Sequence, residues 1–107
     1  MAGPSLPLAQ YAGVYRDAWY GDVKVDQETG GLVIRMMQTP GMVGDLQHWQ
    51  HDTFVARWRD RELRADAYVT FALNPDGSID QVKLAPASPE VDFSFDLQDL
   101  LLRPVPQ

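Results

Sequence analysis

The chain has 107 residues, a net charge of −6 and no cysteine, and 45% of its residues are hydrophobic against 22% charged. This length and composition indicate one folded domain and exclude wholesale disorder. The acidic balance argues against nucleic acid as a partner, and the lack of cysteine excludes a disulfide framework and a thiol nucleophile.

We expect residues 1–9 to form a lead-in segment before the folded body, which we place at residues 10–105. Pro4 and Pro7 allow at most one short helical turn, because the residue before a proline is steered away from the helical region. The segment lacks the basic start and long apolar run of an export signal. Nowhere does the chain offer the ~18 consecutive apolar residues of a membrane span, so we expect a soluble domain.

Two-residue alternation, which is typical of strands with one buried face, recurs through the first half of the chain at residues 11–16, 23–26 and 32–36. Between the last two runs, Glu28-Thr-Gly-Gly predicts a hairpin turn in which two residues are free to adopt positive φ. The stretch 39–45 is rich in glycine and proline and predicts a loop. We therefore expect the next strand to begin at Leu46.

The second half continues in the same manner. Alternation over residues 54–58 directs Phe54 and Trp58 to one face and the intervening arginine to the other. The Asn74-Pro-Asp-Gly turn predicts a hairpin between strands at 67–73 and 79–84. The clearest strand pattern spans residues 91–97, and its two phenylalanines, Phe93 and Phe95, are assigned to the core together with Phe54 and Trp58.

These runs amount to about eight strands at roughly ten-residue spacing, with almost no helical periodicity. Successive hairpins favour an antiparallel meander over Greek-key crossings. The predicted fold is therefore all-β: a single domain over residues 1–107 in which the meander closes into a small barrel, after a short N-terminal helical turn.

The arginines cluster locally and could attract a small anion. They are Arg57, Arg59, Arg61 and Arg64. We favour instead solvated side chains that pair with Asp60, Glu62 and Asp66, because exposed ion pairs are common on folded surfaces and contribute little.

Several segments, taken in order, carry a family resemblance. They are Leu8-Ala-Gln-Tyr-Ala-Gly-Val-Tyr, Trp19-Tyr-Gly-Asp-Val-Lys-Val, Leu46-Gln-His-Trp-Gln-His-Asp-Thr-Phe, Val69-Thr-Phe-Ala-Leu-Asn-Pro-Asp-Gly-Ser-Ile-Asp and Val91-Asp-Phe-Ser-Phe-Asp-Leu. The chain resembles the uncharacterised C-terminal domain of serine β-lactamase-related and penicillin-binding-protein-like hydrolases, a family of lipocalin-like barrels. The resemblance implies an accessory module without assigned catalytic residues, in an exported bacterial protein.

The motifs of that hydrolase class are missing here. No serine is followed by lysine three residues later, no tyrosine by asparagine two residues later, and no Lys-Thr-Gly triplet occurs. We therefore expect a non-catalytic module without a cofactor, whose partner is the catalytic domain of the same polypeptide or assembly. The alternative is a free-standing lipocalin-like binder of a small apolar ligand.

Two histidines could suggest a metal site or a general base, and these are His48 and His51. On a strand, residues three apart point to opposite faces, so one ion could not be shared without a local turn. A histidine beside Asp52 could act as a base, but no nucleophile within reach can be named. Asn74, Asp76 and Asp80 resemble a calcium loop only superficially, because the distal glutamate of such loops is missing and a hairpin turn explains them.

The aromatic residues near strand ends are the remaining candidates. Trp19, Tyr20 and Trp49 lie close to a glycine or a histidine near strand ends, away from the clean alternation that marks core positions. We predict that these three contribute to any ligand-binding mouth or partner surface.

Overall fold

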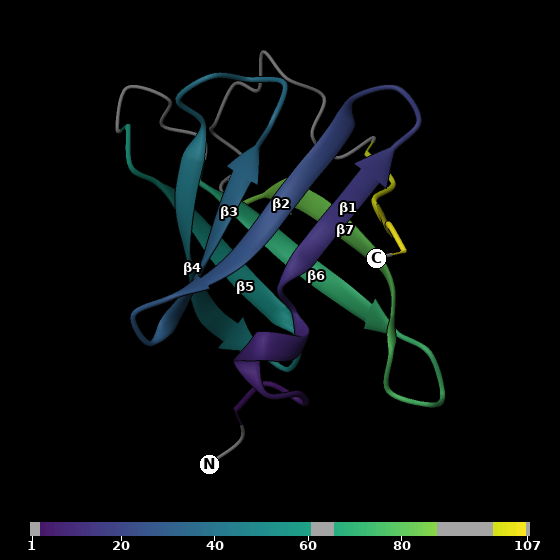
Figure 1. The fold of residues 1–107 in the computed structure, drawn as a ribbon. Helices are drawn as coiled ribbons and strands as arrows, with labels where there is room; N and C mark the ends of the chain where they lie inside the picture. The colour runs from purple at the N-terminus through teal and green to yellow at the C-terminus, as the bar shows by residue number, and fades with distance from the viewer. Residues whose placement is uncertain (1–2, 61–65, 88–99, 107) are drawn as a thin grey trace.

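The computed structural model describes residues 3–60, 66–87 and 100–106. Within them a single sheet follows the chain as a meander and curls into a barrel (Figure 1). A 3-10 turn, η1 (Leu8–Gln10), precedes eight strands: β1 (Gly13–Asp17), β2 (Gly21–Glu28), β3 (Gly31–Met36), β4 (Val43–Gln50), β5 (Thr53–Trp58), β6 (Ala67–Leu73), β7 (Ile79–Pro86) and β8 (Arg103–Pro104). The predicted all-β barrel is confirmed. In these segments no helix is long and apolar enough to cross a membrane.

The barrel closes through a short segment near the C-terminus. Every neighbouring pair of strands is antiparallel, and the order is β7-β6-β5-β4-β3-β2-β1-β8. β8 pairs with β1, and Leu102 forms a bridge to Val82 of β7 with N–H···O distances of 2.8 and 3.2 Å in the two directions. Residues 102–104 therefore join the first strand to the seventh, which covers two sheet edges that would otherwise be exposed.

Alternating apolar side chains fill the barrel interior. Phe54 and Trp58, which the alternation assigned to the core, are each 1% exposed. Tyr11 packs edge-on against Phe54 and Phe71, with ring centroids 5.2 and 4.8 Å apart. An eight-stranded barrel is just wide enough to be filled by its own side chains, and this aromatic cluster occupies the interior.

The sequence misplaced two local boundaries. β4 begins at Val43 rather than Leu46, because Val43 already pairs with Arg35 of β3. In the β2–β3 hairpin, Glu28 pairs with Gly31, so the two-residue turn consists of Thr29 at φ 29° and Gly30 at φ 79°; Gly31 is a strand residue. The predicted turn was therefore one residue too long at its C-terminal end, because Gly31 belongs to β3.

Some sequence predictions cannot be compared with the fold. The expected strand over residues 91–97, with Phe93 and Phe95, lies outside the described residues, as do Arg61 and Arg64. Of the remaining arginines, Arg57 forms an ion pair with Asp66 at 3.6 Å, as expected. Arg59 pairs instead with Asp45 at 2.9 Å, on the neighbouring strand β4.

Gly44 marks a point of close packing inside β4. A Cβ atom at this position would lie 2.8 Å from Cε3 of Trp58 and 3.3 Å from the carbonyl oxygen of Arg57. Trp58 cannot move aside, because it is buried within the core. The strand therefore requires glycine here so that the indole can lie flat against the backbone.

We predict that Gly44→Ala lowers the free energy of unfolding by about 1–3 kcal/mol, the usual cost of overpacking a core. The matched control is Gly31→Ala, in strand β3, where an added Cβ would meet only the carbonyl oxygen of Glu28, at 3.9 Å. Urea unfolding of both variants measures the difference. Equal stability of the two variants would contradict the packing argument.

Candidate functional site

A buried carboxylate organises one end of the barrel, which we call the Trp19 end: the turn 18–20, the loop 37–42 and the segment 100–101. Asp17 ends β1 and is 6% exposed. Its Oδ1 accepts the backbone N–H groups of Trp19 and Tyr20, each at 2.8 Å, and its Oδ2 accepts the N–H of Leu101 at 2.7 Å. One side chain therefore fixes both the β1–β2 turn and the segment that closes the barrel.

The charge of Asp17 is stabilised by its surroundings. Burial on its own raises the pKa of this carboxyl, but the N–H donors of Tyr20, Leu101 and Trp19 and the positive charge of Lys83 outweigh it, so the pKa lies below the usual value. Lys83 also donates from Nζ to the carbonyl oxygen of Leu100 at 2.8 Å. Asp17 and Lys83 thus hold Leu101 and Leu100, the two residues just before the segment that closes the barrel.

Three exposed apolar side chains belong to the segments at this end. Trp19 is 97% exposed, Met37 53% and Leu101 39%. The backbone N–H of Met37 donates to the carbonyl oxygen of Asp22 at 3.1 Å, which places Met37 beside the start of β2. The hydroxyl of Tyr20, which is half-buried, lies 2.7 Å from Oγ1 of Thr39 and ties the turn to the β3–β4 loop.

Trp49 lies at the other end of the barrel, so the three predicted aromatic residues do not share one mouth. β2 leads away from the Trp19 end, β3 returns to it, and β4 leads away again, with Trp49 near its last residue. Sequence reasoning found Trp19 and Tyr20 together but missed Met37 and Leu101. Met37 directly follows buried Met36, and Leu101 lies between two buried leucines. The only sequence signal that could have marked these two residues as exposed was therefore their position next to core residues in the two-residue alternation.

The two histidines do not converge on a common point. Nε2 of His48 lies 2.8 Å from the backbone carbonyl oxygen of His51, and the His48 ring packs edge-on against Phe54 with centroids 5.5 Å apart. His51 is in the β4–β5 turn at φ 49°. Among the described residues, no three histidine, aspartate or glutamate side chains are grouped as metal ligands.

Asp52 holds the N-terminal segment against the barrel. Its carboxylate accepts hydrogen bonds from the hydroxyl of Tyr11 at 2.5 Å and from the hydroxyl of Ser5 at 2.9 Å. Burial and then the hydrogen bond to Asp52 raise the pKa of Tyr11 to about 12. The sequence analysis considered this carboxylate as a partner of a histidine base and did not favour that role; these contacts show that Asp52 ties the segment at η1 to the barrel.

The Asn74-Pro-Asp-Gly segment forms the predicted turn. Gly77 has φ 89°, and its N–H donates to the carbonyl oxygen of Asn74 at 2.9 Å. Oδ1 of Asp76 accepts the backbone N–H of Ser78 at 2.9 Å and its hydroxyl at 2.6 Å, and these bonds lower the pKa of Asp76. The turn accounts for Asn74 and Asp76, and Asp80 forms an ion pair with Arg103 at 3.1 Å.

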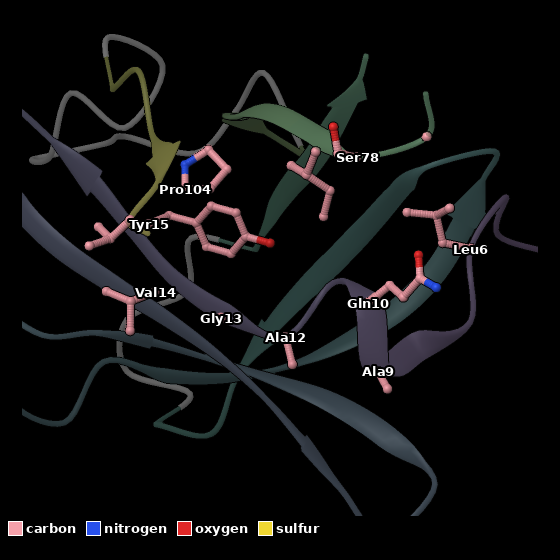
Figure 2. A pocket seen from close by; sticks show the side chains of 12 residues that line it. Leu6, Ala9, Gln10, Ala12, Gly13, Val14, Tyr15, Ser78 and Pro104 are labelled. Atoms are coloured by element: carbon pink, nitrogen blue, oxygen red, sulfur yellow. The ribbon is translucent and has the colours of Figure 1, made fainter. Parts of the chain in front are cut away.

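An apolar cleft of about 450 Å³ opens where the closing segment ends, and we call it the seam cleft (Figure 2). It lies between η1, the start of β1, the β6–β7 turn and the residues after β8. Its apolar lining residues are Leu6, Ala9, Ala12, Val14, Tyr15, Ile79, Pro104 and Val105. Gln10 and Ser78 add polar groups at its margin (Figure 2).

The comparisons with known proteins assign the chain to a family of domains without an assigned function. Residues 1–104 match the family model described as a domain of unknown function, DUF3471. The chain belongs to the DUF3471 family. No curated protein and no solved structure gives a significant match to this DUF3471 domain.

We predict that Asp17→Asn destabilises the DUF3471 domain by about 2–3 kcal/mol at neutral pH, because an amide nitrogen would face a backbone N–H and leave a buried donor unsatisfied. The pKa of Asp17 is lower in the folded chain than in the unfolded chain. Its stabilisation is therefore complete above the unfolded-state pKa and is lost as the pH falls through the lower, folded-state value.

Urea unfolding between neutral pH and pH ~3 measures both effects. The variant should show a shallower loss of stability on acidification than the wild type. Asp45→Asn is the matched control, because Asp45 is exposed and its ion pair with Arg59 is expected to contribute little. A variant as stable as this control would contradict the assigned role of Asp17.

Proposed function

We propose that this chain is a non-catalytic accessory module that packs through its Trp19 end against the catalytic domain of a serine β-lactamase-like hydrolase, in the same polypeptide or assembly. The observation that carries the proposal is the exposure of three apolar side chains, Trp19, Met37 and Leu101, in segments at one end of the barrel, where buried Asp17 holds the backbone at Trp19 and Leu101. The identity of the partner is supported by the resemblance of the sequence to modules that follow such hydrolases.

The energetics favour an interface role for these side chains. Tryptophan is enriched among the residues that dominate binding energy, and burial of an exposed large apolar side chain contributes about 1.5–3 kcal/mol. The turn that bears Trp19 is already ordered by two hydrogen bonds to Asp17. Little backbone conformational entropy is therefore lost when a partner covers the turn.

The experiment measures binding of this chain to the Ser-x-x-Lys domain encoded in the same reading frame or gene neighbourhood, produced as a separate chain. Trp19→Ala should weaken binding at least about tenfold in isothermal titration calorimetry. Trp49→Ala, which removes an exposed indole at the opposite end, is the matched control and should leave the affinity unchanged.

Three results would overturn the proposal. The first is a gene neighbourhood without a Ser-x-x-Lys domain, and the second is unchanged binding by Trp19→Ala. The third is turnover of a chromogenic ester or lactam by this chain alone above the rate in buffer, because the module is proposed to lack catalytic activity.

A second candidate function, the binding of a small apolar molecule, is favoured by the seam cleft. Its volume of about 450 Å³ and its largely apolar lining suit a compact hydrophobic ligand. Because core side chains fill the barrel interior, this lipocalin-like function would use the seam rather than a central cup.

Fluorescence titration with the neutral dye N-phenylnaphthylamine tests the second candidate. Val105→Asp places a carboxylate in the cleft. Ligand binding would remove water from this charge, so the affinity for the dye should fall at least about tenfold. Val43→Asp is the control, because Val43 is equally half-buried but lies outside the cleft. Absence of saturable binding, or equal loss in both variants, would remove this candidate.

A further inference from the structure

A shallow groove on the outer wall of the barrel carries a second set of exposed groups, separate from the Trp19 end. We call it the Trp49 groove. Its volume is about 330 Å³, and it is lined by Trp49, Gln50, His51, Thr53, Tyr68, Thr70 and Ala85. Trp49 is 56% exposed, so much of its indole faces solvent above this groove.

The backbone positions this indole. The register of β4 against β5 shifts between His48 and Gln50, so Trp49 occupies a β-bulge. A bulge turns a side chain away from its regular direction and is typical of strands near binding sites. The next turn holds His51 at φ 49°, a conformation that residues other than glycine adopt uncommonly.

Tyr68 of β6 braces Trp49 from one side. The two ring centroids lie 5.7 Å apart with the planes tilted by 48°. Since the rings are in direct contact, they leave no space for a cation to be enclosed between them. The contact with Tyr68 instead holds the Trp49 indole in place with its exposed face toward solvent. A flat ligand can therefore stack on this face with little loss of side-chain conformational entropy.

The other lining groups define the chemistry of the ligand. Gln50, His51, Thr53, Tyr68 and Thr70 all carry hydrogen-bonding side chains, and the hydroxyls of Thr53 and Thr70 lie 2.9 Å apart. Among the residues that the structure describes, no aspartate, glutamate, lysine or arginine lines the groove. A charged ligand would find no counter-charge in this lining, whereas a neutral ligand with many hydroxyl groups would find both donors and acceptors.

We propose that the Trp49 groove binds a neutral sugar ring of a glycan, stacked on the exposed face of Trp49. The C–H groups on one face of a sugar ring are slightly positive and apolar, and they complement the negative face of an indole. The ring hydroxyls then reach Gln50 at the edge of the indole and the threonine pair on the neighbouring strands. An open groove of this size accommodates one or two rings of a longer chain and implies weak, roughly millimolar affinity.

The experiment uses the whole chain and follows the indole N–H signals of its three tryptophans by nitrogen–proton correlation NMR. The soluble probes are cellohexaose, chitohexaose, xylohexaose and mannohexaose at millimolar concentration. Sedimentation with insoluble cellulose and chitin separates recognition of a polymer surface from recognition of a free oligosaccharide. Choline chloride tests the competing possibility of a cation held by the aromatic pair.

At least one neutral oligosaccharide should shift the Trp49 signal while leaving that of buried Trp58 in place. Trp49→Ala should weaken this binding at least about tenfold, and Trp49→Tyr should retain most of it, because stacking requires an aromatic face. Trp19→Ala is the matched control and should bind as the wild type does. Circular dichroism melting confirms that each variant is folded.

The proposal is overturned if no probe shifts the Trp49 signal, if Trp19→Ala weakens binding as much as Trp49→Ala, or if choline binds and the sugars do not. It does not depend on the proposed hydrolase partner. Loss of sugar binding follows substitution of Trp49, whereas loss of domain packing follows substitution of Trp19, so failure of one proposal leaves the other intact.

Discussion

Closure of the barrel depends on the segment at residues 102–104, which enters between β1 and β7. Leu102 exchanges two backbone hydrogen bonds with Val82, and Arg103 and Pro104 lie opposite Arg16 and Tyr15. Leu102 itself is fully buried, so the segment also contributes to the core. Without it, the two outer strands of the meander would be unpaired edges, which are prone to associate with other chains.

The same closure separates the exposed groups of the molecule into distinct regions. Asp17 and Lys83 anchor residues 100–101 at one end and thereby order the surface that presents Trp19. At the other end, Asp52 anchors the N-terminal segment through Ser5 and Tyr11. The Trp49 groove lies on the outer wall, and none of its lining residues belongs to the Trp19 end.

Much of this fold could be predicted because hydrophobic alternation and turn residues are local signals. The alternation correctly placed Phe54 and Trp58 in the core, and Asn74-Pro-Asp-Gly specified its own turn through Gly77. The start of β4 was misplaced because Gly44 looks like a loop residue, yet its role is to accommodate the ring of Trp58, a contact that depends on the partner strand. Local pattern contains no information about such a contact.

The candidate site was less predictable for the same reason. Trp19 and Trp49 could be selected as aromatic residues outside the alternation, but their separation to opposite ends follows from strand order. The roles of Asp17 and Asp52 depend on partners 84 and 47 residues away along the chain. Long-range hydrogen bonds of this kind appear only when the meander has closed.

The position of β8 in the sequence has a consequence for biosynthesis. A ribosome makes the chain from the N-terminus onward, and β1 can form its hairpin with β2 early, but its second edge waits for residues 103–104. During translation the nascent sheet therefore persists as an open curl. Its completion is a ring-closing step between β1 and residues 103–104, which are far apart in the sequence, so the pairing that locks the domain forms only after both have been made.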